Sequence, residues 1–425
     1  MSRNMVIIGA GQAGARAALE LREQGWKGGI SLIGREAHPP YERPPLSKDA
    51  MVGEAAASPA AIISKASAAE LGIELATNTS AMRIDPSGHR VLLQDGRELG
   101  YERLLLATGA SSRRLLIGGK EPAGLLYLRT YPDALLIRDR LSAGSRIVIV
   151  GAGFTGLELA ASARQRGCEV VVLEAGPRIL MRGVSAEIAA DVYALHRAQG
   201  VAFELGVGIK AIEPIEPAAM GIGRRHLVKL ADGRTIECDA VIAGIGAVPD
   251  TSLAESAGLE IENGIRASHT LATSDADIFA AGDCCSFPHP LYGGRRIRLE
   301  SWRNAEDQGA HAAAAMLGGK EPYAAVPWFW SDQYDRTLQV SGLSDAGATT
   351  VARIAEDGVN RLFFGLDEGG RLVSASGIGA ANIAKDIKAA ELMIQRRLVP
   401  DPALLARPGI KLKSLLLPAS EEKGA

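Results

Sequence analysis

The sequence predicts an α/β fold with two Rossmann-like dinucleotide-binding domains and a C-terminal α+β domain. Two observations predict the Rossmann-like domains. A β-branched run, a glycine turn and a helical pattern open the chain, and the same pattern recurs about 140 residues later. A third observation predicts the last domain, because beyond Pro327 the composition changes to aromatic and β-branched stretches followed by a helical run.

The first βαβ pattern begins with the strand-like run 5–8. Its turn contains Gly9, Gly11 and Gly14 at GxGxxG spacing. One glycine allows the bend, one lets a pyrophosphate approach, and one lets the helix pack closely. Glu36, just past the second strand, is placed to bind a ribose. A lone GxGxxG is a weak signal, but the flanking strand, helix and acid predict a nucleotide site here.

The second pattern has its turn at Gly151, Gly153 and Gly156, and its following strand ends at Glu174. A carboxylate there would accept hydrogen bonds from a ribose 2′-hydroxyl and repel a 2′-phosphate, which favours NADH over NADPH. Arg178 lies four residues further on. An arginine that faced the ribose would weaken the preference for NADH. The alternative is an ordinary surface arginine, which would leave that preference unchanged.

Short apolar strands that end in glycine or aspartate occupy 104–110, 240–250 and 277–283. Such ends place backbone and carboxylate groups at a ligand crevice. The predicted domain ranges are 1–115, 116–245, 246–326 and 327–425.

Composition and the absence of certain sequence patterns limit the classes of protein to which the chain can belong. Apolar residues make up 47% of the chain and charged residues 23%, which is typical of a globular protein. Lys plus Arg number 47 against 49 Asp plus Glu, so no overall positive charge favours nucleic acid. Without an apolar run of about 18 residues or a leader before the first strand, a cytoplasmic protein is expected. No coiled-coil heptads are visible, which favours a monomer or weak dimer.

The four cysteines are Cys168, Cys238, Cys284 and Cys285, and none has the CxxC spacing of a zinc site or a redox dithiol. We therefore expect no metal and reduced, structural thiols. A strained vicinal disulfide between the adjacent pair is the less favoured alternative.

Further motifs occur in register with the glycine turns and carry a family resemblance. They are YERPPLSK at 41–48, ATGA at 107–110, GIG at 244–246 and AAGD at 280–283. With them the chain resembles, nearly end to end, the FAD-dependent NADH:ferredoxin reductases of oxygenase systems, of the putidaredoxin reductase type. The resemblance implies a glutathione-reductase-like fold, with FAD in 1–115 and 246–326 and NADH in 116–245.

The resemblance also implies roles for individual residues. Lys48 would lie beside the flavin and pair with Glu158, and these two are the predicted catalytic residues; a buried lysine needs such a partner. The alternative for Glu158 is a solvated helix residue. Asp283 would contact the ribityl and phosphate region, or merely cap a strand end. Trp330 would lie at the flavin edge, or be a core tryptophan. The remaining cofactor-binding candidates are Arg43, Ala107, Thr108, Gly109, Arg113, Gly246, Gly282 and Glu300.

The implied reaction is hydride transfer from NADH to the flavin, followed by single-electron transfer to a 2Fe-2S ferredoxin that serves a haem monooxygenase or a Rieske-type oxygenase. An acidic ferredoxin would need a basic face, and an ordinary solvated surface is the alternative. The local basic clusters are Arg295, Arg296, Arg298, Lys388, Arg396 and Arg397.

Two other functions stay open. The same fold supports a flavin NADH reductase that acts on a quinone, a dye or another acceptor. A disulfide acceptor is disfavoured, because residues 37–60 contain no cysteine for a thiol relay. A flavoprotein like apoptosis-inducing factor, which binds NADH as a signal, would need a basic surface and a targeting segment.

Overall fold

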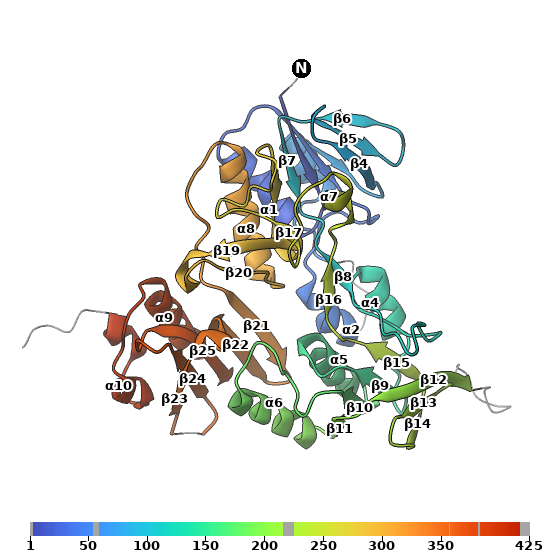
Figure 1. The fold of residues 1–425 in the computed structure, drawn as a ribbon. Coiled ribbons are helices and arrows are strands. Elements are labelled where there is room, and N and C mark those ends of the chain that lie inside the picture. The colour runs from blue at the N-terminus through green and yellow to red at the C-terminus, as the bar shows by residue number, and fades with distance from the viewer. Residues whose placement is uncertain (1–2, 54–58, 216–224, 357, 381–382, 417–425) are drawn as a thin grey trace, which may run out of the picture. The chain divides into compact units, whose positions relative to one another are not determined.

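The computed structural model describes residues 3–53, 59–215, 225–356, 358–380 and 383–416 (Figure 1). By its internal contacts the chain forms two compact units. Unit 1 comprises residues 1–43, 58–111 and 247–327, and unit 2 comprises residues 44–57, 112–246 and 328–425. Within the described residues, no helix is both long and apolar enough to cross a membrane.

Unit 1 is built on a five-stranded sheet in the order β18-β7-β1-β2-β3, with all neighbours parallel. The order reverses beside β1, and such a switch point is where parallel sheets bind ligands. Helix α1 follows β1 and packs against α8. The bounds are β1 (Asn4–Ile8), α1 (Gln12–Glu23), β2 (Gly29–Ile33), β3 (Ile73–Ala76), β7 (Arg103–Leu106), β18 (Ile278–Ala280) and α8 (Trp302–Met316).

Shorter elements complete unit 1. Two three-stranded sheets have the orders β4-β5-β6 and β17-β19-β20. The strands are β4 (Ala81–Asp85), β5 (Arg90–Leu93), β6 (Glu98–Gly100), β8 (Ala110–Ser112), β16 (Ala247–Pro249), β17 (Ile265–Arg266), β19 (Cys285–His289) and β20 (Arg295–Ile297). The helices are α3 (Lys65–Glu70), α7 (Ser252–Ser256) and the 3-10 turns η2 (Gly282–Cys284) and η3 (Pro290–Tyr292).

Unit 2 contains a second parallel sheet, in the order β11-β10-β9-β15. Its buried face packs on the antiparallel sheet β12-β13-β14 through Val148, Val228 and Val241. The strands are β9 (Arg146–Val150), β10 (Glu169–Glu174), β11 (Ala202–Leu205), β12 (Ile209–Ile215), β13 (Arg225–Leu230), β14 (Thr235–Cys238) and β15 (Ala240–Ala243). The helices are η1 (Pro44–Ser47), α2 (Asp49–Val52), α4 (Tyr131–Arg138), α5 (Phe154–Gln165) and α6 (Ala186–Ala198).

The C-terminal part of unit 2 is an antiparallel sheet in the order β21-β22-β25-β24-β23, against which α9 packs (Figure 1). The bounds are β21 (Trp328–Gln333), β22 (Arg336–Gly342), η4 (Ser344–Ala346), β23 (Thr349–Ile354), β24 (Arg361–Leu366), β25 (Leu372–Gly379), α9 (Ile383–Gln395), α10 (Pro402–Ala406) and η5 (Leu412–Leu416). The predicted fold class, two Rossmann-like βαβ patterns and an α+β end, is confirmed. The four predicted domain ranges stay a prediction.

Candidate functional site

The glycine turn of unit 1 has room for a ligand at one position only. A Cβ on Gly9 would lie 2.0 Å from the Ala107 oxygen, and a Cβ on Gly14 would lie 1.9 Å from the Gly9 oxygen. These two glycines are therefore required by the packing of the protein itself. A Cβ on Gly11 would meet nothing within 4 Å, and α1 starts there without a side-chain cap. Free N–H groups and open space fit the pyrophosphate of a dinucleotide.

The turn of unit 2 repeats this arrangement. A Cβ on Gly151 would lie 2.5 Å from the Gly244 oxygen, and one on Gly156 would lie 2.2 Å from the Gly151 oxygen. Gly153 again has open space, and α5 starts there without a side-chain cap. Among the described residues, the α-helices that do have a side-chain cap use Ser64, Thr130, Ser185, Ser301 and Asp401. The residues present therefore fit one dinucleotide in each unit.

Glu36 lies beyond β2 and is held by two neighbours. Its carboxylate accepts hydrogen bonds from Arg43 at 2.6 Å and from the Tyr41 hydroxyl at 2.5 Å. Burial raises the pKa of Glu36, but Arg43 and the Tyr41 hydrogen bond outweigh it and hold that pKa below its ordinary value. Arg43 thus forms an ion pair. The arrangement presents an ionised acceptor, as ribose binding requires.

The ATGA strand end is joined to Asp250 by two hydrogen bonds. The Thr108 hydroxyl donates to the backbone carbonyl oxygen of Asp250 at 2.6 Å. The Asp250 backbone N–H donates to the Gly109 carbonyl oxygen at 2.9 Å. The Asp250 carboxylate lies 3.2 Å from Arg35. These bonds hold the end of β7 in place beside the first glycine turn.

The AAGD motif forms η2 at the end of β18. A Cβ on Gly282 would lie 3.2 Å from the Cβ of Ala13, so this motif reaches the start of α1. Asp283 follows and is half-buried. Glu300 is exposed and forms an ion pair with Arg298 at 2.7 Å. The structure therefore brings Asp283, but not the Glu300 carboxylate, into the buried surroundings of the motif.

Glu174 is anchored at the end of β10. Its carboxylate accepts from the Ala152 N–H at 2.8 Å and from the Gly176 N–H at 2.7 Å. Arg178 donates to the carbonyl oxygens of Ile179 and Leu180, at 3.0 and 2.8 Å. The carboxylate is therefore fixed beside the second glycine turn, while the arginine is bound to its own loop.

The most closely packed group of candidate residues is in unit 2, around Glu158. This residue lies in the second turn of α5 and is buried, so it is not a solvated helix residue. Lys48 Nζ lies 3.4 Å from its Oε1. The hydroxyls of Ser47 and Ser331 donate to its two oxygens, at 2.5 and 2.6 Å. Ser47 is itself held, since Ser162 donates to its carbonyl oxygen at 2.7 Å. Neither serine donor was predicted from the sequence.

Strand β21 adds a second carboxylate to Lys48. Asp332 Oδ2 lies 3.4 Å from Lys48 Nζ, and Trp330 Nε1 donates to that oxygen at 3.2 Å. The ammonium also lies 5.4 Å from the Trp330 ring centroid, and Trp330 stacks on Trp328. Trp330 is half-buried and is not a core tryptophan. Asp332 was not predicted from the sequence, although side chains two apart on a strand, such as those of Trp330 and Asp332, share a face.

The last two candidates meet near the end of β15. The Arg113 N–H donates to the Gly246 oxygen at 2.9 Å, and Gly246 has a φ of +105°. A Cβ there would also lie 3.4 Å from a guanidinium nitrogen of Arg182. The left-handed conformation and this contact both favour glycine at this position.

Cys168, Cys238, Cys284 and Cys285 are all buried and free. Burial raises the pKa of each thiol, that of Cys238 to about 12. Across the described residues, no group of three or more histidine, cysteine and acidic side chains is placed to hold a metal ion.

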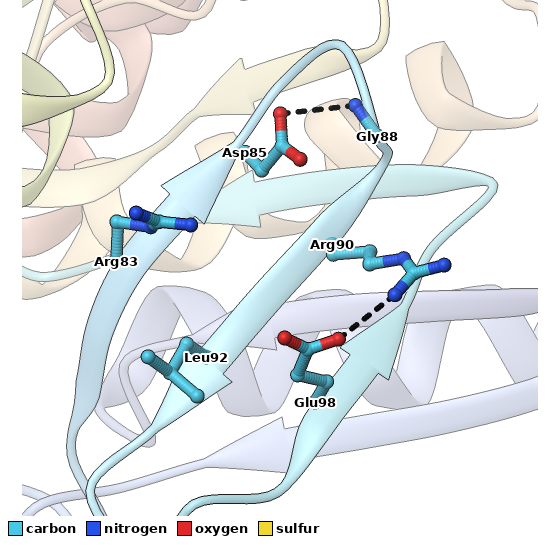
Figure 2. A pocket seen from close by; sticks show the side chains of 6 residues that line it. All are labelled: Arg83, Asp85, Gly88, Arg90, Leu92 and Glu98. Carbon is cyan, nitrogen blue, oxygen red and sulfur yellow. Dashed lines mark hydrogen bonds and ion pairs between the residues drawn. The ribbon is translucent and has the colours of Figure 1, made fainter.

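A surface hollow of about 240 Å³ lies elsewhere in unit 1, on the sheet β4-β5-β6 (Figure 2). Arg90 and Glu98 form an ion pair in it at 2.9 Å, and Asp85 accepts from the Gly88 N–H at 3.0 Å. None of its lining residues is a candidate from the sequence. No candidate residue lies in the hollow, so the hollow is not part of the candidate site.

Two family models match the chain. The model described as pyridine nucleotide-disulphide oxidoreductase matches residues 3–309, which include both glycine turns. The model described as reductase C-terminal matches residues 328–416, which include Trp330 and Asp332.

Relatives match the chain over most of its length. The ferredoxin–NAD(+) reductase component of an anthranilate 1,2-dioxygenase system from Burkholderia cepacia is 41% identical, over 97% of this chain and 98% of the relative. A rubredoxin–NAD(+) reductase from Pseudomonas putida is 39% identical, over 82% of this chain and 89% of the relative. The reductase in a crystal structure of a covalent putidaredoxin reductase–putidaredoxin complex has a TM-score of 0.90 at 34% identity, covering 97% of this chain and 98% of that one.

Proposed function

The chain belongs to the pyridine nucleotide-disulphide oxidoreductase family, and we propose that it is an FAD-dependent NADH:ferredoxin oxidoreductase of an oxygenase system. The observation that carries the proposal is the pair of uncapped glycine turns, one in each unit, each with open space at its middle glycine. Two such turns supply sites for two dinucleotides, as an enzyme that moves electrons from NADH to FAD requires. We propose that residues 1–115 and 246–326 hold FAD and that 116–245 hold NADH.

The acceptor is proposed from chemistry and from the relatives. FAD supplies the ability to take electrons as a pair and to release them singly. No cysteine lies in 37–60 to form a thiol relay, and the four cysteines are buried and free. These features disfavour a disulfide acceptor. The relative from the anthranilate 1,2-dioxygenase system is a ferredoxin reductase by name. That supports a 2Fe-2S ferredoxin serving a haem monooxygenase or Rieske-type oxygenase.

In this proposal Lys48 and Glu158 are the catalytic residues. The ammonium of Lys48 would stabilise negative charge that develops on the bound flavin, and Glu158 would hold that ammonium in place. Trp330 would wall the same region with its ring. Glu36, with Arg43, and Asp283 would bind the FAD side. Glu174 would accept from the NADH ribose, and the engagement of Arg178 with its own loop supports a preference for NADH over NADPH.

A basic docking face for the ferredoxin has less support than the sequence suggests. Arg296 pairs with Glu262 at 3.2 Å, Arg298 with Glu300 at 2.7 Å, and Lys388 with Glu391 at 2.8 Å. Acids beside these three cations offset their charges. Arg396 and Arg397 are adjacent in the sequence, and we propose them as the pair on which a role in docking is tested. Reversing their charge should slow ferredoxin reduction at low salt and leave NADH oxidation by a dye unchanged.

The decisive test is stopped-flow absorbance with purified protein, first with NADH, then NADPH, then a 2Fe-2S ferredoxin. Rapid flavin bleaching by NADH, followed by rapid ferredoxin reduction, is the expected result. Bleaching without onward transfer would instead favour a quinone, a dye or the signalling role of an apoptosis-inducing-factor-like protein. A rubredoxin belongs in the same test, because a rubredoxin–NAD(+) reductase is among the relatives. A colourless protein that binds no FAD would refute the proposal.

Location and assembly are further parts of the proposal. Four buried, free thiols are typical of a reducing compartment, which supports a cytoplasmic protein. We propose a monomer or weak dimer, which sedimentation at several protein concentrations would test. No role with nucleic acid or membrane is proposed.

A further inference from the structure

Lys48 lies between two carboxylates that compete for it. Its Nζ is 3.4 Å from Glu158 Oε1 and 3.4 Å from Asp332 Oδ2. The Glu158 side chain is 11% exposed and the Asp332 side chain is 44% exposed. Because the two distances are equal, the position of the ammonium depends on how firmly each carboxylate is held by its other neighbours.

The two carboxylates are held by different groups. Glu158 accepts from two buried hydroxyls, those of Ser47 and Ser331. Asp332 accepts from the Trp330 indole and, at 3.1 Å, from the Thr337 hydroxyl. Hydrogen bonds to an ionised group are stronger than those between neutral groups, so each donor fixes the carboxylate that it reaches. Losing one donor from Glu158 would therefore favour Asp332 as the partner of Lys48.

A buried chain of side chains determines which way the Ser331 hydroxyl points. The Gln333 amide nitrogen donates to the Ser331 oxygen at 2.8 Å, which leaves the serine proton for Glu158. The Gln333 amide oxygen lies 2.8 Å from His196 Nε2. An amide oxygen only accepts, so Nε2 must carry the proton. His196 Nδ1 is then free to accept from the Tyr334 hydroxyl at 3.3 Å.

The chain Tyr334, His196, Gln333, Ser331 is thus a series of donors that all point toward Glu158. Ser331, Gln333 and His196 are each fully buried, so water does not offer an alternative partner. Burial also lowers the pKa of His196 to about 4, so the ring is neutral near pH 7. A neutral ring with one proton suits a chain in which each member donates once.

We propose that Ser331, Gln333 and His196 are positioning residues that keep Lys48 on Glu158 and away from Asp332. They do this by forcing the Ser331 hydroxyl to donate to the Glu158 carboxylate. The effect of the chain on flavin reduction rests on the proposed function. The direction of its hydrogen bonds does not, and the two are tested separately.

A double-mutant cycle tests the competition for Lys48. Ser331→Ala removes one donor from Glu158 and should slow flavin reduction by NADH about tenfold, the order expected for one hydrogen bond to a charged group. Asp332→Asn in that background removes the competing charge and should restore the rate to within about threefold of wild type. Ser341→Ala is the matched control. Ser341 is equally buried, on the neighbouring strand, and its hydroxyl has no partner among the described residues.

Gln333→Glu tests the direction of the chain with a side chain of the same size. A carboxylate at this position accepts from Ser331, so Ser331 would no longer donate to Glu158. We expect the same loss of rate as in Ser331→Ala. Two outcomes would overturn the proposal. One is that Asp332→Asn does not restore the rate of the Ser331→Ala variant. The other is that the Ser331→Ala and Gln333→Glu variants reduce their flavin as fast as the Ser341→Ala control.

Two measurements need no turnover. Nitrogen-15 NMR of the histidine-labelled protein, with seven histidines and His196→Asn for assignment, should show His196 neutral and protonated on Nε2 near pH 7. A crystal structure of Ser331→Ala should show Lys48 Nζ closer to Asp332 than to Glu158. A proton on Nδ1, or an ammonium that stays on Glu158, would overturn the inference even if the protein is a ferredoxin reductase. Both measurements test the hydrogen-bonded chain whether or not the protein reduces a ferredoxin.

Discussion

Replacing Glu158 with glutamine should destabilise unit 2 measurably. Removing one partner of a buried ion pair costs about 3–5 kcal/mol. Two features of the site reduce this value. Asp332 gives Lys48 a second carboxylate at 3.4 Å, and the glutamine oxygen still accepts from Ser331. We therefore expect a loss of about 2 kcal/mol, which corresponds to a fall in Tm of about 4–8 °C for a unit of this size.

Scanning calorimetry at a fixed excess of FAD measures this change, since a bound ligand itself shifts the Tm. The matched control is Glu213→Gln. Glu213 pairs with Lys229 at 2.8 Å in the same unit, but the two side chains are 50% and 39% exposed. An exposed pair contributes little, so this variant should lose less than about 2 °C. Equal losses in the two variants would refute the reasoning that burial makes the Glu158 pair important.

Three further predictions concern other parts of the chain. Gly14→Ala should fail to retain FAD because its Cβ would lie 1.9 Å from the Gly9 oxygen. Gly11→Ala should keep the fold and weaken FAD binding about tenfold or more. Flavin absorbance after gel filtration distinguishes the two variants. Glu174→Gln should lower the ratio of kcat/KM for NADH over NADPH at least about fivefold, because it removes the charge that repels a 2′-phosphate. The pKa of His196 is lowered from 6.5 to about 4 in the folded state, so its contribution to stability is complete above pH 6.5 and is lost as the pH falls toward 4. Urea unfolding of wild type at pH 7 and pH 5 should differ by about 2 kcal/mol more than in His196→Asn.

The glycine turns were predictable because their chemistry is local. Gly9 and Gly14 lie five residues apart, and the contact that excludes a side chain at Gly14 is with the Gly9 backbone itself. The same is true of Gly151 and Gly156. Spacing alone therefore predicts the turn, the helix that follows it and the place where a pyrophosphate can approach.

The surroundings of Lys48 were only partly predictable. Motif resemblance suggested Glu158 as its partner, 110 positions away, but no pattern near Lys48 or Glu158 pointed to Ser331 or Asp332. Both come from β21, more than 170 residues after Glu158. His196, on α6, enters the same hydrogen-bonded chain through Gln333.

The sequence by itself determined the two βαβ units, the α+β end, the family resemblance and the lack of a thiol relay, because these depend on spacing and residue type over short stretches. Only the tertiary structure decided that Lys48 has two carboxylates, that Arg178 is bound to its own loop, and that Arg296 is paired with an acid. The ion pairs of Lys48 and Arg296 depend on which distant side chains are brought together, and the bonds of Arg178 depend on the conformation of its loop. Such hydrogen bonds and ion pairs depend on packing, which periodicity does not encode.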